Sequence, residues 1–102
     1  MTRIPLPNRR PSATVDVAFG TVTVGFDALG QPREVFANGP KEGSDMQATI
    51  ADACVVISIA LQHGVPPAAL GKSLGSVPDW NGAIRPASAI GIIVAAIAEA
   101  AG

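Results

Sequence analysis

Residues 44–63 read SDMQATIADACVVISIALQH, and this stretch decides the fold. Ser44 can accept a hydrogen bond from a free amide of a first helical turn, and Asp45 carries the charge that a helix N-terminus favours. Gly64 supplies the left-handed residue that ends many helices, and prolines follow at 66 and 67. Apolar residues recur between these signals at intervals of three and four. The pattern predicts one long helix.

The second half of this helix is apolar on nearly every side, because Ser58 is the only polar residue in 53–61. A helix of that composition is normally covered on more than one side. We therefore expect segments both upstream and downstream of it to pack against it.

The upstream segment has the pattern of β-strands. Apolar and polar residues alternate over 14–19 and again over 21–26, which is the two-residue period of half-buried strands. The parity changes across Gly20, which indicates a tight turn or a bulge. A turn over 27–32 and a short strand over 34–37 complete a hairpin. Three antiparallel strands need a cover on their apolar face, and we expect the long helix to supply it.

Two more helices are predicted downstream. A short one covers 66–74, with a proline at its first position, and a longer one runs from 86 or 88 to 100. Residues 75–85 between them are predicted to be a loop.

The order of these elements predicts an α+β domain of two layers. It contains a three-stranded antiparallel sheet followed by a long central helix, a short helix and a C-terminal helix. This single domain spans residues 13–102, and residues 1–12 form an extended basic, proline-rich arm.

Composition narrows the class of protein. The 102 residues are 48% hydrophobic and 15% charged, which is typical of one folded domain. A net charge of −1 argues against a protein that coats nucleic acid through bulk charge. A single cysteine fits reducing surroundings, and no apolar leader follows the N-terminal arginines. The longest strongly apolar run, 53–61, is shorter than the ~20 residues of a membrane span, so we expect a cytoplasmic protein without a membrane contact.

Catalytic chemistry finds little support in the sequence. Cys54 lies in the apolar stripe of the long helix, where a thiol without a cationic neighbour is inert and packs as a small hydrophobe. His63 at the helix end fits a capping role better than a catalytic one. Asp45 and Asp52 share a helix face but lie two turns apart, so they do not form an acid–base pair. We predict no catalytic residue, no metal and no cofactor in this chain, and an enzyme acting alone is the weakest hypothesis.

The loop before the long helix has the ingredients of an anion site. A helix N-terminus, flexible glycine and a lysine come together at Lys41, Gly43 and Ser44. The loop lacks the ending of a P-loop, and Glu42 and Asp45 oppose an anion. A simple strand-to-helix turn with a capping serine is the favoured alternative.

Other candidate contact residues lie outside this loop. Arg9 and Arg10 on the arm and Arg85 further along could contact phosphate or an acidic surface, although a solvated tail is the simpler interpretation of the arm. Trp80 could stack on a base or a partner, but a tryptophan in such a loop more often plugs the open end of a small core.

Five segments occur in the order typical of one family: LPNRRPS at 6–12, PREVF at 32–36, KEGS at 41–44, SIALQHGVP at 58–66 and RPASAIG at 85–91. The chain thereby resembles TSCPD-type proteins over nearly its whole length. These are the C-terminal module of adenosylcobalamin-dependent (class II) ribonucleotide reductase and its small stand-alone relatives. The most specific segment is 58–66, because ending a helix does not require that sequence.

The chain departs from this family near its C-terminal end. The cysteines of larger members, including the one in the signature, have no counterpart, and VPD at 77–79 and PAS at 86–88 stand in that region. No metal or thiol function is therefore carried over. The reductase barrel, with its catalytic thiols and cobalamin site, is several times longer than this chain. The resemblance implies kinship with ribonucleoside-diphosphate reductase rather than that activity in this chain alone.

Two hypotheses follow. The resemblance implies a non-catalytic accessory module in nucleotide metabolism and DNA synthesis, which contacts ribonucleotide reductase, a nucleotide or single-stranded nucleic acid. Its contact residues would be Arg9, Arg10, Lys41, Gly43, Ser44 and Arg85. The alternative is a homo-oligomeric scaffolding domain with no nucleotide role. This alternative is based on the last helix, which is apolar on more than one face and could therefore form the interface of a homodimer.

Overall fold

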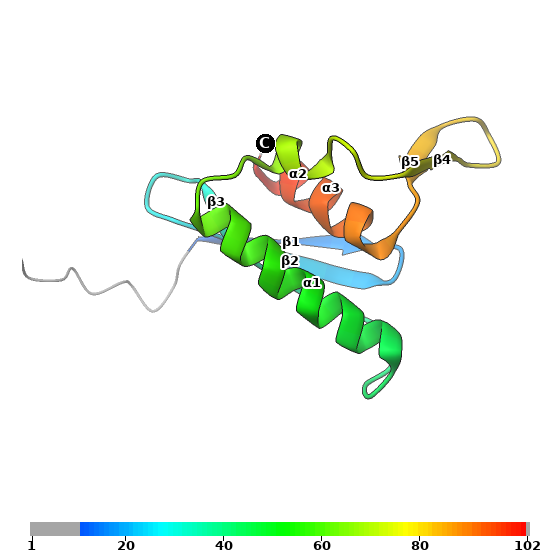
Figure 1. Ribbon diagram of the computed structural model, residues 1–102, viewed down its shortest axis with the longest axis horizontal. Coiled ribbons are helices and arrows are strands. Elements are labelled where there is room, and N and C mark those ends of the chain that lie inside the picture. Colours follow the sequence, from blue (N-terminus) through cyan, green and yellow to red (C-terminus); the bar gives the residue numbers. More distant parts are fainter. Residues whose placement is uncertain (1–10, 102) are drawn as a thin grey trace, which may run out of the picture.

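The computed structural model describes residues 11–101 and confirms the predicted α+β domain (Figure 1). A three-stranded antiparallel sheet is followed by a long helix, a short helix and a C-terminal helix. The elements are β1 (Ser12–Val17), β2 (Gly20–Phe26), β3 (Pro32–Asn38), α1 (Asp45–Gln62), α2 (Pro67–Gly71), β4 (Ser76–Pro78), β5 (Ile84–Pro86) and α3 (Ala89–Ala101).

The prediction of a plain loop over 75–85 is wrong, because β4 and β5 pair there as an antiparallel hairpin. Each strand has only three residues, too few to show an alternating pattern. Both strands also end in a proline, which normally argues against a strand.

The sheet has the order β1-β2-β3, and one of its faces is apolar. The register places Val15 opposite Val22 and Val24 opposite Val35, so these four valines share the face that points into the core. The opposite face is polar where β1 and β2 meet: the hydroxyls of Thr14 and Thr23 lie 3.1 Å apart there.

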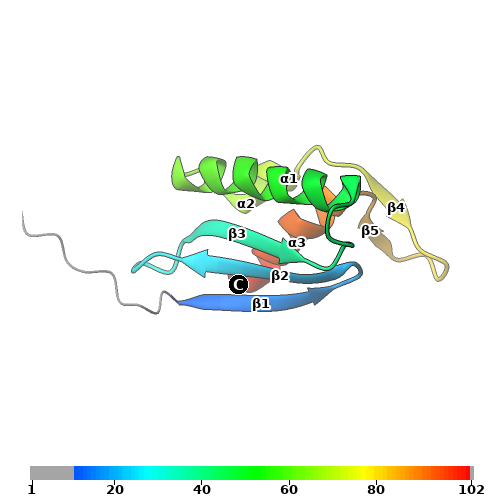
Figure 2. The ribbon, with the colours of Figure 1, turned by 90° about the horizontal axis from the view of Figure 1, so that it is seen from below.

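The apolar face of the sheet is covered by α3, not by the long helix as the sequence suggested. Helix α3 contacts all three strands, whereas α1 lies mainly against β3, at the end of the row of strands (Figure 2). The core consists of residues from the sheet and both helices: Val22, Val24, Val35, Ile50, Cys54, Ile57, Leu61, Ile93, Val94, Ala96 and Ile97. Burial of the Cys54 thiol raises its pKa, as expected for a structural cysteine.

Polar side chains of α1 hold the helix at the outer edge of β3. The Ser58 hydroxyl accepts a hydrogen bond from the Val35 amide at 3.0 Å, and the Gln62 side-chain amide donates to the Arg33 carbonyl at 3.2 Å. These groups occupy backbone positions that a further strand would otherwise use. They explain why α1 lies beside the sheet instead of across it.

The predicted signals at both ends of α1 are confirmed. Ser44 is the N-cap, and its hydroxyl accepts from the Gln47 amide at 3.1 Å. At the other end His63 is the C-cap, and Gly64 has a φ of +85°. The amides of Gly64 and Val65 then donate to α1 carbonyls, each at 3.0 Å, which is the Schellman arrangement that ends helices.

Segments upstream and downstream of α1 pack against it as expected, since β3 and α3 both contact the helix. Its outer side is nevertheless uncovered, and Val55, Val56 and Ile59 are each more than half exposed there. By length and composition α1 is the one described helix able to cross a membrane. This is weak evidence for a span, since core helices of globular proteins pass the same test.

Candidate partner-contact site

The hairpin formed by β4 and β5 projects from the body of the domain (Figures 1 and 2). Val77 lies opposite Arg85, and Pro78 lies opposite Ile84. A further backbone hydrogen bond lies at the base of the hairpin, where the Ala87 amide donates to the Gly75 carbonyl at 3.0 Å. The hairpin is therefore an ordered projection rather than an irregular loop.

The tip of the hairpin is organised by Asp79. One carboxylate oxygen of Asp79 accepts hydrogen bonds from the amides of Asn81 at 3.1 Å and Ala83 at 3.0 Å. Its backbone amide donates to the Ala83 carbonyl at 2.7 Å, and its carbonyl accepts from the Gly82 amide at 3.0 Å. These bonds fix the conformation of the tip before any partner arrives.

Trp80 lies at this tip with 94% of its surface exposed, so the expectation that it plugs the core is wrong. The hairpin carries it away from the core, and Ile84 on β5 of the same hairpin is 70% exposed. The signal that would have revealed this is Asn81-Gly82, because an Asn-Gly pair is characteristic of tight hairpin turns. An exposed tryptophan on a fixed turn is suited to contact a partner.

A groove of about 310 Å³ lies between this hairpin, α2 and α3. Its walls are mostly apolar and include Leu74, Pro86, Val94 and Ala98, and Arg85 is the charged residue among them. The hairpin thus presents an aromatic tip and, closer to the body, an apolar groove with one cation.

The structure places the predicted site residues in separate regions. Lys41, Gly43 and Ser44 share one turn before α1, in which the Ser44 amide donates to the Lys41 carbonyl at 3.1 Å. Arg85 lies apart from them, on the hairpin. Arg9 and Arg10 lie outside the described residues.

The turn before α1 uses its amides within the chain. The Gly43 amide donates to the Gln47 side-chain oxygen at 2.8 Å, and the Gln47 amide donates to Ser44. This geometry supports the capping interpretation of Ser44. Anion binding by the same turn stays a prediction.

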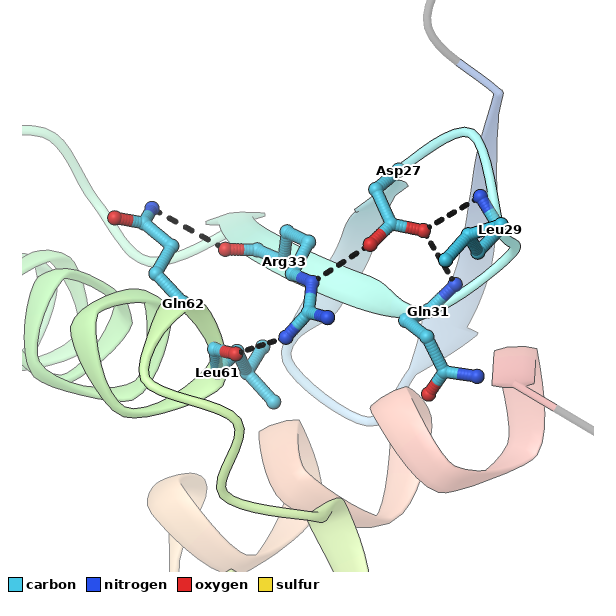
Figure 3. Close-up of polar contacts among 6 residues, drawn as sticks. All are labelled: Asp27, Leu29, Gln31, Arg33, Leu61 and Gln62. Carbon is cyan, nitrogen blue, oxygen red and sulfur yellow. Dashed lines mark hydrogen bonds and ion pairs between the residues drawn. The ribbon is translucent and has the colours of Figure 1, made fainter.

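A polar cluster that the sequence reasoning missed joins the β2–β3 turn to the end of α1 (Figure 3). The Asp27 carboxylate accepts from the amides of Leu29 at 2.8 Å and Gln31 at 3.0 Å, and from the Arg33 Nε at 2.9 Å. Arg33 Nη1 also donates to the Leu61 carbonyl at 2.7 Å. The cation therefore sits where helix carbonyls favour positive charge, and the cluster fixes the helix against the sheet.

These bonds make the contribution of Asp27 to stability depend on pH. The Gln31 amide and then the Arg33 side chain lower the pKa of Asp27 below its usual 3.8. A carboxylate whose pKa is lower in the folded protein than in the unfolded chain stabilises the fold when the pH is above its unfolded-state pKa. This stabilisation is lost as the pH falls through its folded-state pKa. We expect Asp27→Asn to be less stable than the native chain at pH 6, with the difference shrinking below pH ~4. Urea unfolding of both proteins from pH 2.5 to 6 measures this, and a constant difference would contradict it.

Residues 11–101 contain no group of three or more histidine, cysteine or acidic side chains arranged to hold a metal ion. Cys54 is buried, whereas His63 is exposed at the end of the same helix. The Cys54 thiol is thus surrounded by the core, not by a base.

The sheet, the α3 cover and the projecting hairpin define a small α+β domain. The family model of the TSCPD domain matches residues 7–101, and the chain therefore belongs to the TSCPD domain family. This domain is associated with ribonucleotide reductase-related proteins. No curated protein and no solved structure matches the chain.

The resemblance implies a departure from the TSCPD pattern at 77–79 and 86–88. The structure places Val77 and Pro78 of the first segment in β4 and Pro86 of the second at the end of β5.

Proposed function

We propose that this protein is a non-catalytic accessory module, related to class II ribonucleotide reductase, that acts by protein contact through the β4–β5 hairpin. The observation that carries the proposal is Trp80, which is 94% exposed on a tip held by hydrogen bonds to Asp79. The module acts in the cytoplasm, in the nucleotide metabolism that supports DNA synthesis.

The hairpin has the properties of a binding hot spot. Tryptophan and arginine are the side chains that most often dominate binding energy at interfaces, and the hairpin carries both in Trp80 and Arg85. Its tip is already ordered, so little conformational entropy is lost on binding. Ile84 adds exposed apolar surface on the same hairpin.

The partner proposed is a ribonucleotide reductase, because the family to which the chain belongs is associated with reductase-related proteins. Trp80 would enter an apolar pocket of the reductase, and Arg85 would lie near an acidic residue. Nucleotide or single-stranded nucleic acid binding through Arg9, Arg10, Lys41 and Arg85 is less favoured. Lys41 and Arg85 lie on different elements, and the hairpin carries one cation rather than a basic patch.

The test is an affinity pull-down of the tagged chain from its own host, at low and high salt, with Trp80→Ala and a matched control. Leu29→Ala is that control, because Leu29 is 85% exposed on a different turn. We expect the native chain and Leu29→Ala to retain a reductase and Trp80→Ala to lose it. With the purified reductase, Trp80→Ala is expected to raise the Kd at least about 30-fold, as for hot-spot residues.

Arg85→Gln removes the positive charge of the hairpin and leaves Trp80 in place, so it measures the contribution of the charge to binding separately from that of the tryptophan. We expect it to weaken binding at low salt and to reduce the difference between the two salt conditions. Equal retention of reductase by a folded Trp80→Ala would show that the contact lies elsewhere. Recovery of no reductase by the native chain would contradict the proposed partner.

A further inference from the structure

The three-stranded sheet has one closed edge and one open edge. At the closed edge, the Ser58 and Gln62 side chains bond to the outward-facing backbone of β3, so no further strand can add there. At the other edge β1 is the last strand of the row (Figure 2). Strand β1 contains none of the prolines, lysines or bulges that proteins commonly use to block an exposed edge.

The pairing of β1 with β2 shows which backbone groups lie on the open edge. The Phe26 amide donates to the Pro11 carbonyl at 2.9 Å, which makes these two residues a hydrogen-bonded pair. Such pairs alternate along an antiparallel ladder, so every second residue of β1 bonds to β2. The N–H and C=O groups of the residues between them point away from the sheet, and these residues are Ser12, Thr14 and Asp16. Within residues 11–101 none of these backbone groups has a hydrogen-bond partner.

The hydrophobic core is also open at this edge. Val22 on β2 and Val35 on β3 are at most 1% exposed, whereas Val15 and Val17 on β1 are only partly buried. A hollow of about 190 Å³ lies at the same edge, between Val17 and Ile92 of α3. An added strand with apolar side chains on the α3 side would therefore bond to the free backbone groups and also extend the core.

We infer that β1 pairs with β1 of a second copy of the chain, antiparallel, so that the two sheets form one continuous sheet. The added strand must alternate apolar residues on the α3 side with polar residues on the other side, and β1 itself has this alternation along its six residues. Among the described strands, β1 is the one with an open edge of this length. Ile93 and Ile97 of α3, the helix that the sequence suggested for a homodimer interface, are buried inside the chain. Trp80 lies on a separate hairpin, so the inference does not depend on the proposed function.

One register pairs all the outward-facing backbone groups of the two strands. A two-fold axis at Thr14 places this residue opposite its own copy and places Ser12 opposite Asp16 of the second copy. Each of these pairs can exchange two backbone hydrogen bonds, which gives roughly six across the interface. An axis at Asp16 would instead bring two carboxylates face to face, and an axis at Val15 would place Ser12 beyond the end of the partner strand.

Sedimentation equilibrium of the full chain tests the inference. The native chain is expected to have twice its monomer mass of 10.3 kDa. Thr14→Pro removes the amide at the axis and is expected to raise the dimer Kd at least about tenfold, because both hydrogen bonds of that pair are lost. A monomer tolerates proline where the N–H faces away from the sheet.

The matched control is Thr14→Val. It loses the same hydroxyl contact with Thr23 but keeps the backbone amide, so it should remain dimeric. Circular dichroism confirms that both variants are folded.

A charge exchange tests the register. Ser12→Asp is expected to weaken the dimer, because the new carboxylate would face Asp16 of the second copy at both ends of the interface. Combining it with Asp16→Lys is expected to restore the dimer, since each carboxylate would then meet a lysine. Failure of the second substitution to restore the dimer overturns this register.

Hydrogen exchange followed by NMR locates the interface without a substitution. The Thr14 amide is expected to exchange slowly at concentrations where the chain is dimeric and rapidly on dilution. The Val15 amide bonds to β2 and is expected to remain protected in both conditions.

Three other results overturn the inference. One is a native chain that stays monomeric up to millimolar concentration. A second is a dimer in which the Thr14 amide exchanges freely and Thr14→Pro has no effect. The third is a monomer whose Thr14 amide becomes protected only when a reductase is added, which would assign the open edge to a strand of that partner.

Discussion

Ile97→Ala is expected to lower the free energy of unfolding by about 2–5 kcal/mol, the usual range for truncation of a buried isoleucine. Ile97 is fully buried in α3, in the core that this helix shares with the sheet. Removing the side-chain atoms loses their transfer free energy and leaves a cavity beneath the sheet. Because α3 is the cover of the apolar face, a defect there affects helix and sheet together.

Urea unfolding followed by circular dichroism measures the effect, with Ile90→Ala as the control. Ile90 is on the same helix but is 38% exposed, so its truncation is expected to cost less than half as much. Equal losses for the two variants would mean that α3 does not pack on the sheet as described.

Gly20→Ala is expected to be a highly damaging single-methyl change, with a loss of about 3 kcal/mol or more. Gly20 begins β2 with a φ of +153°, which L-residues rarely adopt. A Cβ there would overlap the Asn38 carbonyl oxygen and crowd Gly39, the residue that follows β3. These neighbours are backbone atoms, so relief requires the strands to separate.

Gly30→Ala is the control that separates the cost of a positive φ from the cost of steric overlap with neighbouring atoms. Gly30 also has a positive φ, +80°, but no atom lies within 4 Å of the position its Cβ would take. Its cost is therefore only that of the left-handed conformation, about 1–2 kcal/mol. Thermal unfolding of both variants ranks them, and a Gly20→Ala protein as stable as Gly30→Ala would contradict the close approach of the strands.

Local signals predicted most of the individual elements. The caps of α1 were readable because Ser44 and Gly64 act on amides and carbonyls a few residues away. Alternation predicted the first two strands, and the change of parity between them reflects the tight turn just before Gly20. Such features depend on neighbours in the sequence, and so the sequence reveals them.

The relation between elements was less predictable. Both α1 and α3 have apolar stripes, and periodicity shows that a stripe exists without showing which surface it meets. The choice depends on long-range bonds such as Ser58 to Val35, which join residues 23 positions apart. Of the candidate site, Arg85 was identified as a contact residue, but the position of Trp80 depends on a hairpin whose strands are too short to leave a pattern.

The position of α3 has a consequence for the synthesis of the protein. The apolar face formed by Val22, Val24 and Val35 is complete early in translation, yet its cover consists of residues 89–101. Until those residues leave the ribosome, the sheet exposes its core side to solvent, which is the condition under which nascent chains recruit chaperones or aggregate. The growing chain therefore has no complete core before residues 89–101 are synthesised and α3 can pack on the three strands.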